Sequence, residues 1–126
     1  MNKTIINTEK APAPIGPYSQ AILSNDTLYV SGQIAIDAAT GDMVNSDITA
    51  ETHQVMKNMG YILEAAGMDY RNVVKCGIFV KDMNDFAAIN AAYGEYFQVT
   101  PPARETVEVS RLPKDVNVEI SCVAVK

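Results

Sequence analysis

Histidine and cysteine, the side chains that most often carry metal or nucleophilic chemistry, are scarce in this chain. His53 is the only histidine, and no Cys-x-x-Cys or His-x-x-x-His spacing accompanies it. This disfavours a zinc site and a Ser-His-Asp triad. Cys76 and Cys122 fall in strand-like apolar rows, and we expect both to be buried, reduced thiols. Gly-rich phosphate-binding motifs are also missing.

Long apolar runs and basic clusters are absent as well. No stretch has the length needed to span a bilayer, and the N-terminus has no apolar run of signal-peptide length, so we expect a cytoplasmic protein. The net charge is −5, and no cluster of Lys and Arg with interleaved aromatics offsets it, which disfavours nucleic acid as a main partner. At 126 residues, the chain predicts one domain, residues 1–126, with a single core.

The apolar periodicity predicts an alternation of strands and helices. Strands are expected at residues 4–7, 19–24, 27–36 and 72–81, helices at 49–66 and 84–97, and two more strands on either side of a turn at 112–115. Residues 11–18 form a loop because three prolines and a glycine interrupt them. This order predicts an α+β domain in which both helices cover one face of a single mixed sheet.

The segment 101–123 holds one basic and one acidic residue of special interest. Apolar residues alternate in both of its strands, at Val107 and Val109 in the first and at Val118, Ile120, Cys122 and Ala124 in the second. A period of two then puts Arg104 and Glu119 on the faces opposite these apolar rows. Both could be ordinary surface charges, but two prolines before Arg104 fix its backbone, and arginine suits a planar carboxylate.

Four further positions are candidates for a site, each with a structural alternative. Ser31 falls on the same kind of polar face as Arg104 and Glu119. Gly32 marks either a packing glycine or a place where a ligand or backbone comes close. Tyr18, at the end of the proline loop, either packs or serves the site. Asn90 lies within the apolar stripe of the second helix, and it either braces a loop or faces a ligand.

The sheet face without helices is expected to be partly apolar. It would carry Tyr29, Ser31, Phe79, Thr106, Val123 and Val125. A wholly solvated face of this composition is disfavoured, so we expect a homo-oligomer that buries it. A site built from Ser31, Arg104 and Glu119 would then lie near a subunit boundary.

Several blocks of the sequence together resemble one known family. They are IGPYSQ at 15–20, SGQ at 31–33, FVKDMNDF at 79–86, PAR at 102–104, and RLPKD at 111–115 followed by VEI at 118–120. In this order, and across essentially the whole chain, they resemble the RidA family, also called the YjgF family.

The resemblance implies a chorismate-mutase-like α+β fold assembled as a homotrimer, with sites in the clefts between subunits. The implied activity is 2-iminobutanoate/2-iminopropanoate deaminase. Such enzymes hydrolyse enamines and imines such as 2-aminoacrylate, which pyridoxal-phosphate-dependent dehydratases release, to 2-oxo acids and ammonia. They use no cofactor and no metal.

By position, the resemblance assigns roles to the candidate residues. Arg104 would bind the substrate carboxylate with help from the backbone N–H of Gly32, and Glu119 would hold or activate the attacking water. The pocket would be shaped by Tyr18, Ser31 and Asn90. Many members have a cysteine where this chain has Thr106. Water attacks in the implied mechanism, so we expect activity to survive this change, whereas regulation by oxidation of that thiol loses its basis.

Two other functions are attached to this family. One is a non-catalytic trimer that binds small carboxylates or acts like a chaperone, and Arg104 favours the enzyme over it. The other is a ribonuclease or translation inhibitor, which the negative net charge and the single histidine disfavour.

Overall fold

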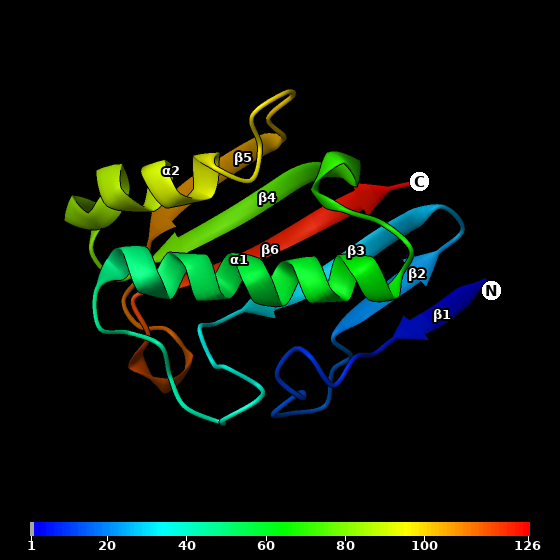
Figure 1. The fold of residues 1–126 in the computed structure, drawn as a ribbon, viewed down its shortest axis with the longest axis horizontal. Coiled ribbons are helices and arrows are strands. Elements are labelled where there is room, and N and C mark those ends of the chain that lie inside the picture. Colours follow the sequence, from blue (N-terminus) through cyan, green and yellow to red (C-terminus); the bar gives the residue numbers. More distant parts are fainter. Residues whose placement is uncertain (1) are drawn as a thin grey trace.

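The computed structural model describes residues 2–126, which fold around one six-stranded sheet (Figure 1). The strands are β1 (Lys3–Ile6), β2 (Ala21–Ser24), β3 (Thr27–Gln33), β4 (Val73–Val80), β5 (Ala103–Glu108) and β6 (Val118–Val125). Their order across the sheet is β1-β2-β3-β6-β4-β5. All neighbours are antiparallel except β4 and β5, which run parallel. The sheet is therefore mixed, as predicted.

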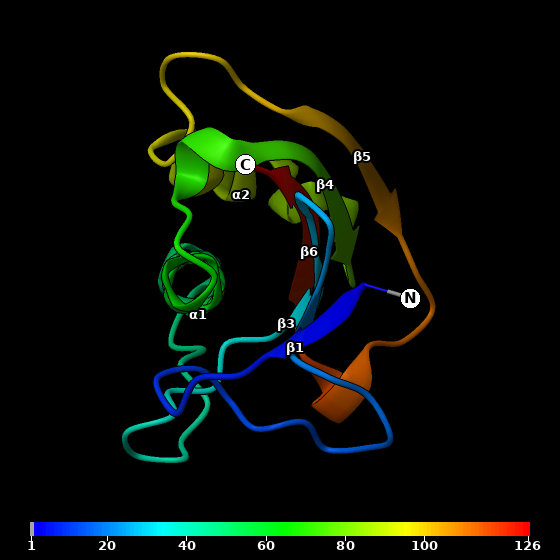
Figure 2. The ribbon, with the colours of Figure 1, turned by 90° about the vertical axis from the view of Figure 1, so that its right-hand side faces the viewer.

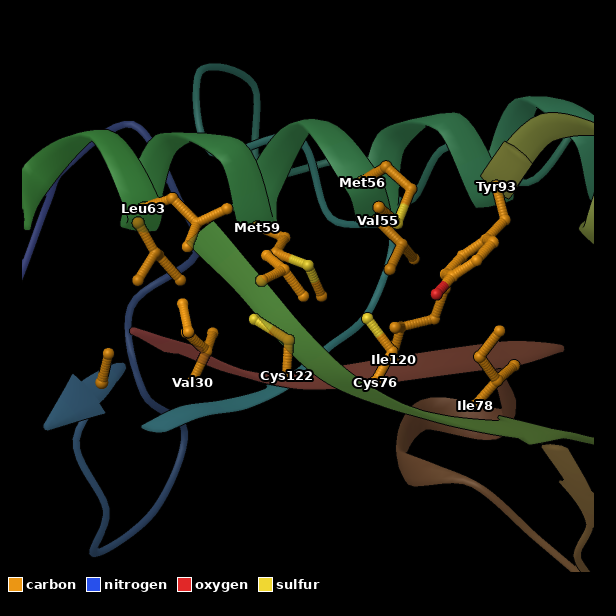
Figure 3. Close-up of a cluster of buried hydrophobic side chains, with 14 of the residues drawn as sticks. Val30, Val55, Met56, Met59, Leu63, Cys76, Ile78, Tyr93, Ile120 and Cys122 are labelled. Atoms are coloured by element: carbon orange, nitrogen blue, oxygen red, sulfur yellow. The ribbon is translucent and has the colours of Figure 1, made fainter. Parts of the chain in front are cut away.

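Two helices, α1 (Ile48–Ala65) and α2 (Phe86–Gly94), lie on the same face of the sheet, and no α-helix of the described residues covers the opposite face (Figure 2). The core lies between α1 and the central strands (Figure 3). Its fully buried members include Leu28, Val55, Met56, Met59, Ile62, Leu63, Ile78, Ile120 and Ala124. The α+β prediction is confirmed. Among the described helices, none has the length and apolar character needed to cross a membrane.

The predicted boundaries of α1 agree with the structure to within one residue, because both ends carry strong local signals. The Asp47 side chain accepts a hydrogen bond from the Ala50 N–H at 2.7 Å and caps the first turn. Gly67 follows the last turn with a φ of 74°, the left-handed conformation that ends many helices.

The second helix is shorter than predicted. Residues 84–97 were expected to be continuous, but a 3-10 turn, Met83–Asp85, precedes α2, and residues after Gly94 leave the helix. The side chain of Asp82, one of the two expected caps, accepts a hydrogen bond from the Asn84 N–H at 2.9 Å.

One predicted core position in β4 is wrong. In the sequence, Val74 alternates with the apolar Cys76 and Ile78, which predicts that it shares their face, but the pairing of β4 with β6 shifts register between Val73 and Lys75. This irregularity turns Val73 into the core and leaves Val74 48% exposed. Alternation in the sequence cannot reveal such a shift, because it assumes a constant period of two.

The two strands of the 101–123 segment form, but they are not neighbours. The turn at 112–115 is present, with a 3-10 turn at Pro113–Asp115, yet β4 lies between β5 and β6. As the edge strand next to β4, β5 places Arg104 beside the buried Cys76. Side chains at paired positions share a face, so Arg104 lies on the helix side of the sheet.

The predicted faces of β5 are therefore reversed. Arg104 and Thr106 point to the side of α2, whereas Val107 is 41% exposed on the side without helices. Thr106 accordingly does not belong to the open face where it was expected. Tyr29 and Val123, two other residues expected on that face, pair across β3 and β6 and therefore share one face.

Candidate active site in two halves

A pocket of about 290 Å³ lies at the end of β3 and the start of β6, against the proline loop. It is lined by Ile15, Tyr18, Ser31, Gly32, Ile34, Pro113 and Glu119. Four of the residues predicted for the site therefore meet here: Tyr18, Ser31, Gly32 and Glu119. We call this pocket the Glu119 half-site.

Gln20, a buried glutamine that is not among the predicted site residues, fixes the proline loop. Gln20 is 3% exposed, and its side-chain oxygen accepts a hydrogen bond from the Thr8 N–H at 2.8 Å. Its amide group donates to the carbonyls of Thr8 and Pro12 at 3.0 and 2.9 Å. These bonds hold the loop that carries Ile15 and Tyr18 into the half-site. In the sequence, the available sign is a glutamine close after a proline-rich loop, whose side chain can both donate to and accept from the loop backbone.

Ser31 also holds this loop. Its hydroxyl donates to the carbonyl of Ser19 at 2.6 Å, and its backbone N–H donates to the carbonyl of Gln20 at 3.0 Å. The hydroxyl hydrogen is thus already used, so Ser31 can only accept a hydrogen bond from a ligand. The Tyr18 hydroxyl accepts from the Ile15 N–H at 3.2 Å, which leaves its own hydrogen free to donate.

Gly32 lies where the pairing of β3 with β6 changes register, and the side chain of Glu119 folds over it. A Cβ at Gly32 would lie 2.8 Å from Cδ of Glu119, a distance that real atoms avoid. Glu119 is only half-buried, and burial raises the pKa of its carboxyl group. Its carboxylate has no hydrogen-bond or ion-pair partner among residues 2–126. A carboxyl group with these properties suits a general base.

Arg104 lies in a second cluster, formed by β5 and α2. The carbon at the centre of its guanidinium is 5.1 Å from the ring centre of Tyr93 and 5.7 Å from that of Phe86. Within the described part of the chain, the guanidinium makes no hydrogen bond and no ion pair. The other two arginines do: Arg71 pairs with Asp69 at 2.7 Å and Arg111 with Asp115 at 2.9 Å.

Three buried polar atoms of the same two elements have no hydrogen-bond partner in the described part of the chain: Asn90 Oδ1, the Tyr93 hydroxyl and Thr106 Oγ1. Buried polar groups are nearly always paired, so unpaired ones near an open guanidinium indicate a place for a ligand or water. The oxygen of Asn90 braces no loop, which favours the ligand-facing alternative. We call Arg104, Asn90, Tyr93, Phe86 and Thr106 the Arg104 half-site.

Within one copy of the chain, the two half-sites lie apart. Arg104 lies on the helix side of the edge strand β5, whereas Glu119 belongs to the opposite face of β6, and β4 separates the two strands. The predicted site residues therefore fall into two groups, Tyr18, Ser31, Gly32 and Glu119 in one and Asn90 and Arg104 in the other.

His53 belongs to neither half-site. Its Nδ1 lies 2.8 Å from the Tyr96 hydroxyl, and its Nε2 lies 3.4 Å from Glu95 Oε2. Tyr96 and Glu95 also line a pocket of about 470 Å³ that none of the predicted site residues reaches.

Comparison with known proteins places this α+β domain in a family. The Endoribonuclease L-PSP family matches residues 8–126. A RutC family protein of Pyrococcus horikoshii is 54% identical over 124 residues, which cover 98% of each chain. The goat (Capra hircus) protein named 2-iminobutanoate/2-iminopropanoate deaminase is 48% identical over 124 residues, 98% of this chain and 90% of that protein.

A solved structure is similarly close. Escherichia coli TdcF, crystallised with bound serine, superposes with a TM-score of 0.94 at 39% identity and covers 98% of each chain. The chain therefore belongs to the Endoribonuclease L-PSP family, which is the RidA family that its motifs resemble.

Proposed function

We propose that this chain is a 2-iminobutanoate/2-iminopropanoate deaminase, which hydrolyses 2-imino acids and their enamine tautomers to 2-oxo acids and ammonia. The observation that carries the proposal is the unpaired guanidinium of Arg104. The other two arginines each have a carboxylate partner, and Arg104 has none among residues 2–126. A half-buried guanidinium without a partner is suited to bind the carboxylate of a ligand. The goat relative's name supports this activity.

We further propose that the active site forms between subunits of a homotrimer, where the Arg104 half-site of one copy meets the Glu119 half-site of the next. The separation of the two half-sites within one copy supports this assembly. The partly apolar open face supports it too, because Tyr29 is 53% and Val107 41% exposed in a single copy.

The chemistry needs a bound carboxylate and a positioned water. Arg104 holds the substrate carboxylate, so that the imine carbon faces Glu119. Glu119 takes a proton from water while the water oxygen bonds to that carbon, which turns the C=N bond into a C–N single bond. That proton then passes to nitrogen and gives a carbinolamine. Glu119 next moves the hydroxyl proton to the same nitrogen, and ammonia leaves as the C–N bond breaks and the C=O bond forms. Overall, one water is consumed and one ammonia released.

The test measures pyruvate formation from 2-aminoacrylate that a serine dehydratase generates in situ. The wild-type protein is expected to accelerate it, and Arg104→Ala is expected to abolish the acceleration. Arg111→Ala is the matched control, because Arg111 is exposed and paired with Asp115. If the wild-type protein accelerates neither this reaction nor that of 2-iminobutanoate, yet binds 2-oxo acids through Arg104, the non-catalytic carboxylate binder replaces the enzyme.

Sedimentation equilibrium tests the assembly. A mass of three chains is expected for the wild type and for Arg104→Ala. A monomer that hydrolyses 2-aminoacrylate at full rate would contradict a site shared between subunits.

An endoribonuclease activity, which the family's description names, has less support in this chain. The net charge of −5 opposes RNA binding. Both ring nitrogens of His53 face partners, the Tyr96 hydroxyl and Glu95. Tight, salt-dependent binding in an RNA titration would overturn this judgement.

A further inference from the structure

We propose that the rings of Tyr93 and Phe86 position the guanidinium of Arg104, so that α2 sets how well the site holds a carboxylate. The inference rests on the proposed role of Arg104 as the carboxylate-binding residue. It adds two positioning residues that touch the arginine rather than the reacting atoms.

The first step is that no polar contact places this guanidinium. Within residues 2–126 it makes no hydrogen bond or ion pair, and it lies 5.1 Å from the ring centre of Tyr93 and 5.7 Å from that of Phe86. Both distances are within the range of cation–π attraction. The rings therefore orient the cation without using its five N–H donors, which stay free for a ligand. A carboxylate partner from the protein would orient Arg104 as well, but would occupy those donors.

The second step is that Tyr93 is itself fixed. It is 5% exposed, and its ring lies 4.8 Å from that of Phe97 with a tilt of 47°. Figure 3 shows its ring pointing from α2 toward the sheet, near Cys76. Burial, with a smaller effect of the Cys76 thiol, raises the pKa of Tyr93, so its hydroxyl stays neutral. Cys76 is also the strand neighbour of Arg104, so the ring and the arginine share one rigid frame.

The third step is that the two rings differ in their exposure to water. Phe86 is 38% exposed and begins α2, whereas Tyr93, in the last turn of α2, is 5% exposed. Cation–π attraction is stronger where water is excluded. Loss of the Tyr93 ring should therefore weaken carboxylate binding more than loss of the Phe86 ring.

Isothermal titration with 2-oxobutanoate, a stable product that carries the carboxylate, tests the inference apart from turnover. Tyr93→Leu is expected to raise Kd about tenfold and Phe86→Leu about threefold. Tyr93→Phe, which keeps the ring, should restore most of the affinity. In hydrolysis of 2-iminobutanoate, Tyr93→Leu should raise KM by a similar factor and change kcat little.

A double-mutant cycle separates positioning from general damage. In an Arg104→Ala background, the additional substitution Phe86→Leu or Tyr93→Leu should cause no further loss of 2-oxobutanoate affinity. The same loss with and without Arg104 would overturn the inference, as would wild-type affinity in both leucine variants. If Tyr93→Leu fails to fold, the cycle of Arg104→Ala with Phe86→Leu still tests the inference, because Phe86 is partly exposed.

The test also distinguishes this inference from the proposed function. If 2-oxobutanoate binds through Arg104 and the rings matter, but no imine is hydrolysed, the deaminase proposal fails and the ring inference stands. If 2-oxobutanoate binds equally well without Arg104, the ring inference fails, whatever the hydrolysis assay gives.

Discussion

The side chain of Glu119 lies directly against the backbone of Gly32, in the space that a Cβ would occupy. Such an atom would come within 2.8 Å of Cδ and 3.0 Å of Cγ of Glu119. The glycine is thus required by a side chain on the neighbouring strand, and its φ is not in the left-handed region. Close approach, rather than an unusual turn, explains this glycine near the end of β3.

Gly32→Ala should therefore displace the carboxylate of Glu119. We expect kcat for 2-iminobutanoate hydrolysis to fall about a hundredfold, because a misplaced general base loses most of its effect. Steady-state kinetics check this, with Gly94→Ala as the control, since a Cβ at Gly94 meets nothing within 4 Å. Unchanged kinetics in Gly32→Ala would mean that Glu119 needs no fixed position.

The pKa of Glu119 makes a prediction about stability and pH. Burial raises this pKa above its ordinary value of 4.5. Below the ordinary value the carboxyl group is protonated in both the folded and the unfolded chain, so its burial costs no charge-desolvation free energy. As pH rises through the raised pKa of the folded state, the buried group becomes charged and the folded state loses stability. Glu119→Gln lacks this charge and should be the more stable protein at pH 7.

Urea unfolding at fixed protein concentration, repeated between pH 4 and pH 8, checks this, because assembly makes stability depend on concentration. The advantage of Glu119→Gln should shrink as pH falls and vanish below about pH 4.5. An advantage that is constant across this range would show that the carboxyl has an ordinary pKa. Glu119 can act as a base only when its carboxyl group is deprotonated. The raised pKa therefore predicts that, as the solution is acidified, kcat/KM of the wild type begins to fall at a pH above 4.5.

The two cysteines are predicted to be inert in the folded protein. Cys76 and Cys122 lie opposite each other on β4 and β6, are 0% and 4% exposed, and are free thiols. Burial raises the pKa of both, which keeps them protonated. At pH 8, a thiol reagent such as Ellman's should therefore titrate neither in the native protein and both in guanidinium. Rapid native labelling of either thiol would contradict their burial.

Most elements of the fold were predictable because their signals are local. The caps of α1, the prolines of residues 11–18 and the apolar periodicity of the central strands depend on nearby residues only. The faces of β5 were not predictable, because alternation alone does not say which row faces the helices. In this edge strand the apolar Val107 lies on the open side and Arg104 on the side of α2. The sequence also gave no sign of the register shift at Val74.

The candidate site could likewise be predicted only in part. Tyr18, Ser31, Gly32 and Glu119 meet in one pocket, as positions on β3, β6 and the proline loop allow. The expectation that Arg104 lies on the same kind of face as Ser31 and Glu119 is wrong, because β5 pairs with β4 instead of β6 and the register puts Arg104 beside the buried Cys76, on the helix side of the sheet. Strand order depends on long-range pairing, which no short pattern encodes. This strand order separates the site into two halves, and the separation is the reason for proposing an assembly.

A fully buried carboxylate outside both half-sites should be important for stability. Glu51, in the first turn of α1, is 0% exposed and accepts hydrogen bonds from the backbone N–H and the side-chain amide of Asn117, both at 2.8 Å. These bonds tie α1 to the chain just before β6, two residues from Glu119. Glu51→Ala would leave two donors unsatisfied and a cavity, and we expect it to cost about 3 kcal/mol of unfolding free energy.

Glu64→Ala is the matched control, because Glu64 lies on the same helix, is 70% exposed and forms only a 3.7 Å pair with Lys10. It should change the unfolding free energy by no more than about 0.5 kcal/mol. Urea unfolding of both variants at one protein concentration measures the difference. If Glu51→Ala cost as little as the control, the bonds to Asn117 would contribute little net stability. Loss of 2-iminobutanoate turnover in Glu51→Ala under conditions where it remains folded would then indicate that the contact chiefly positions β6 and Glu119.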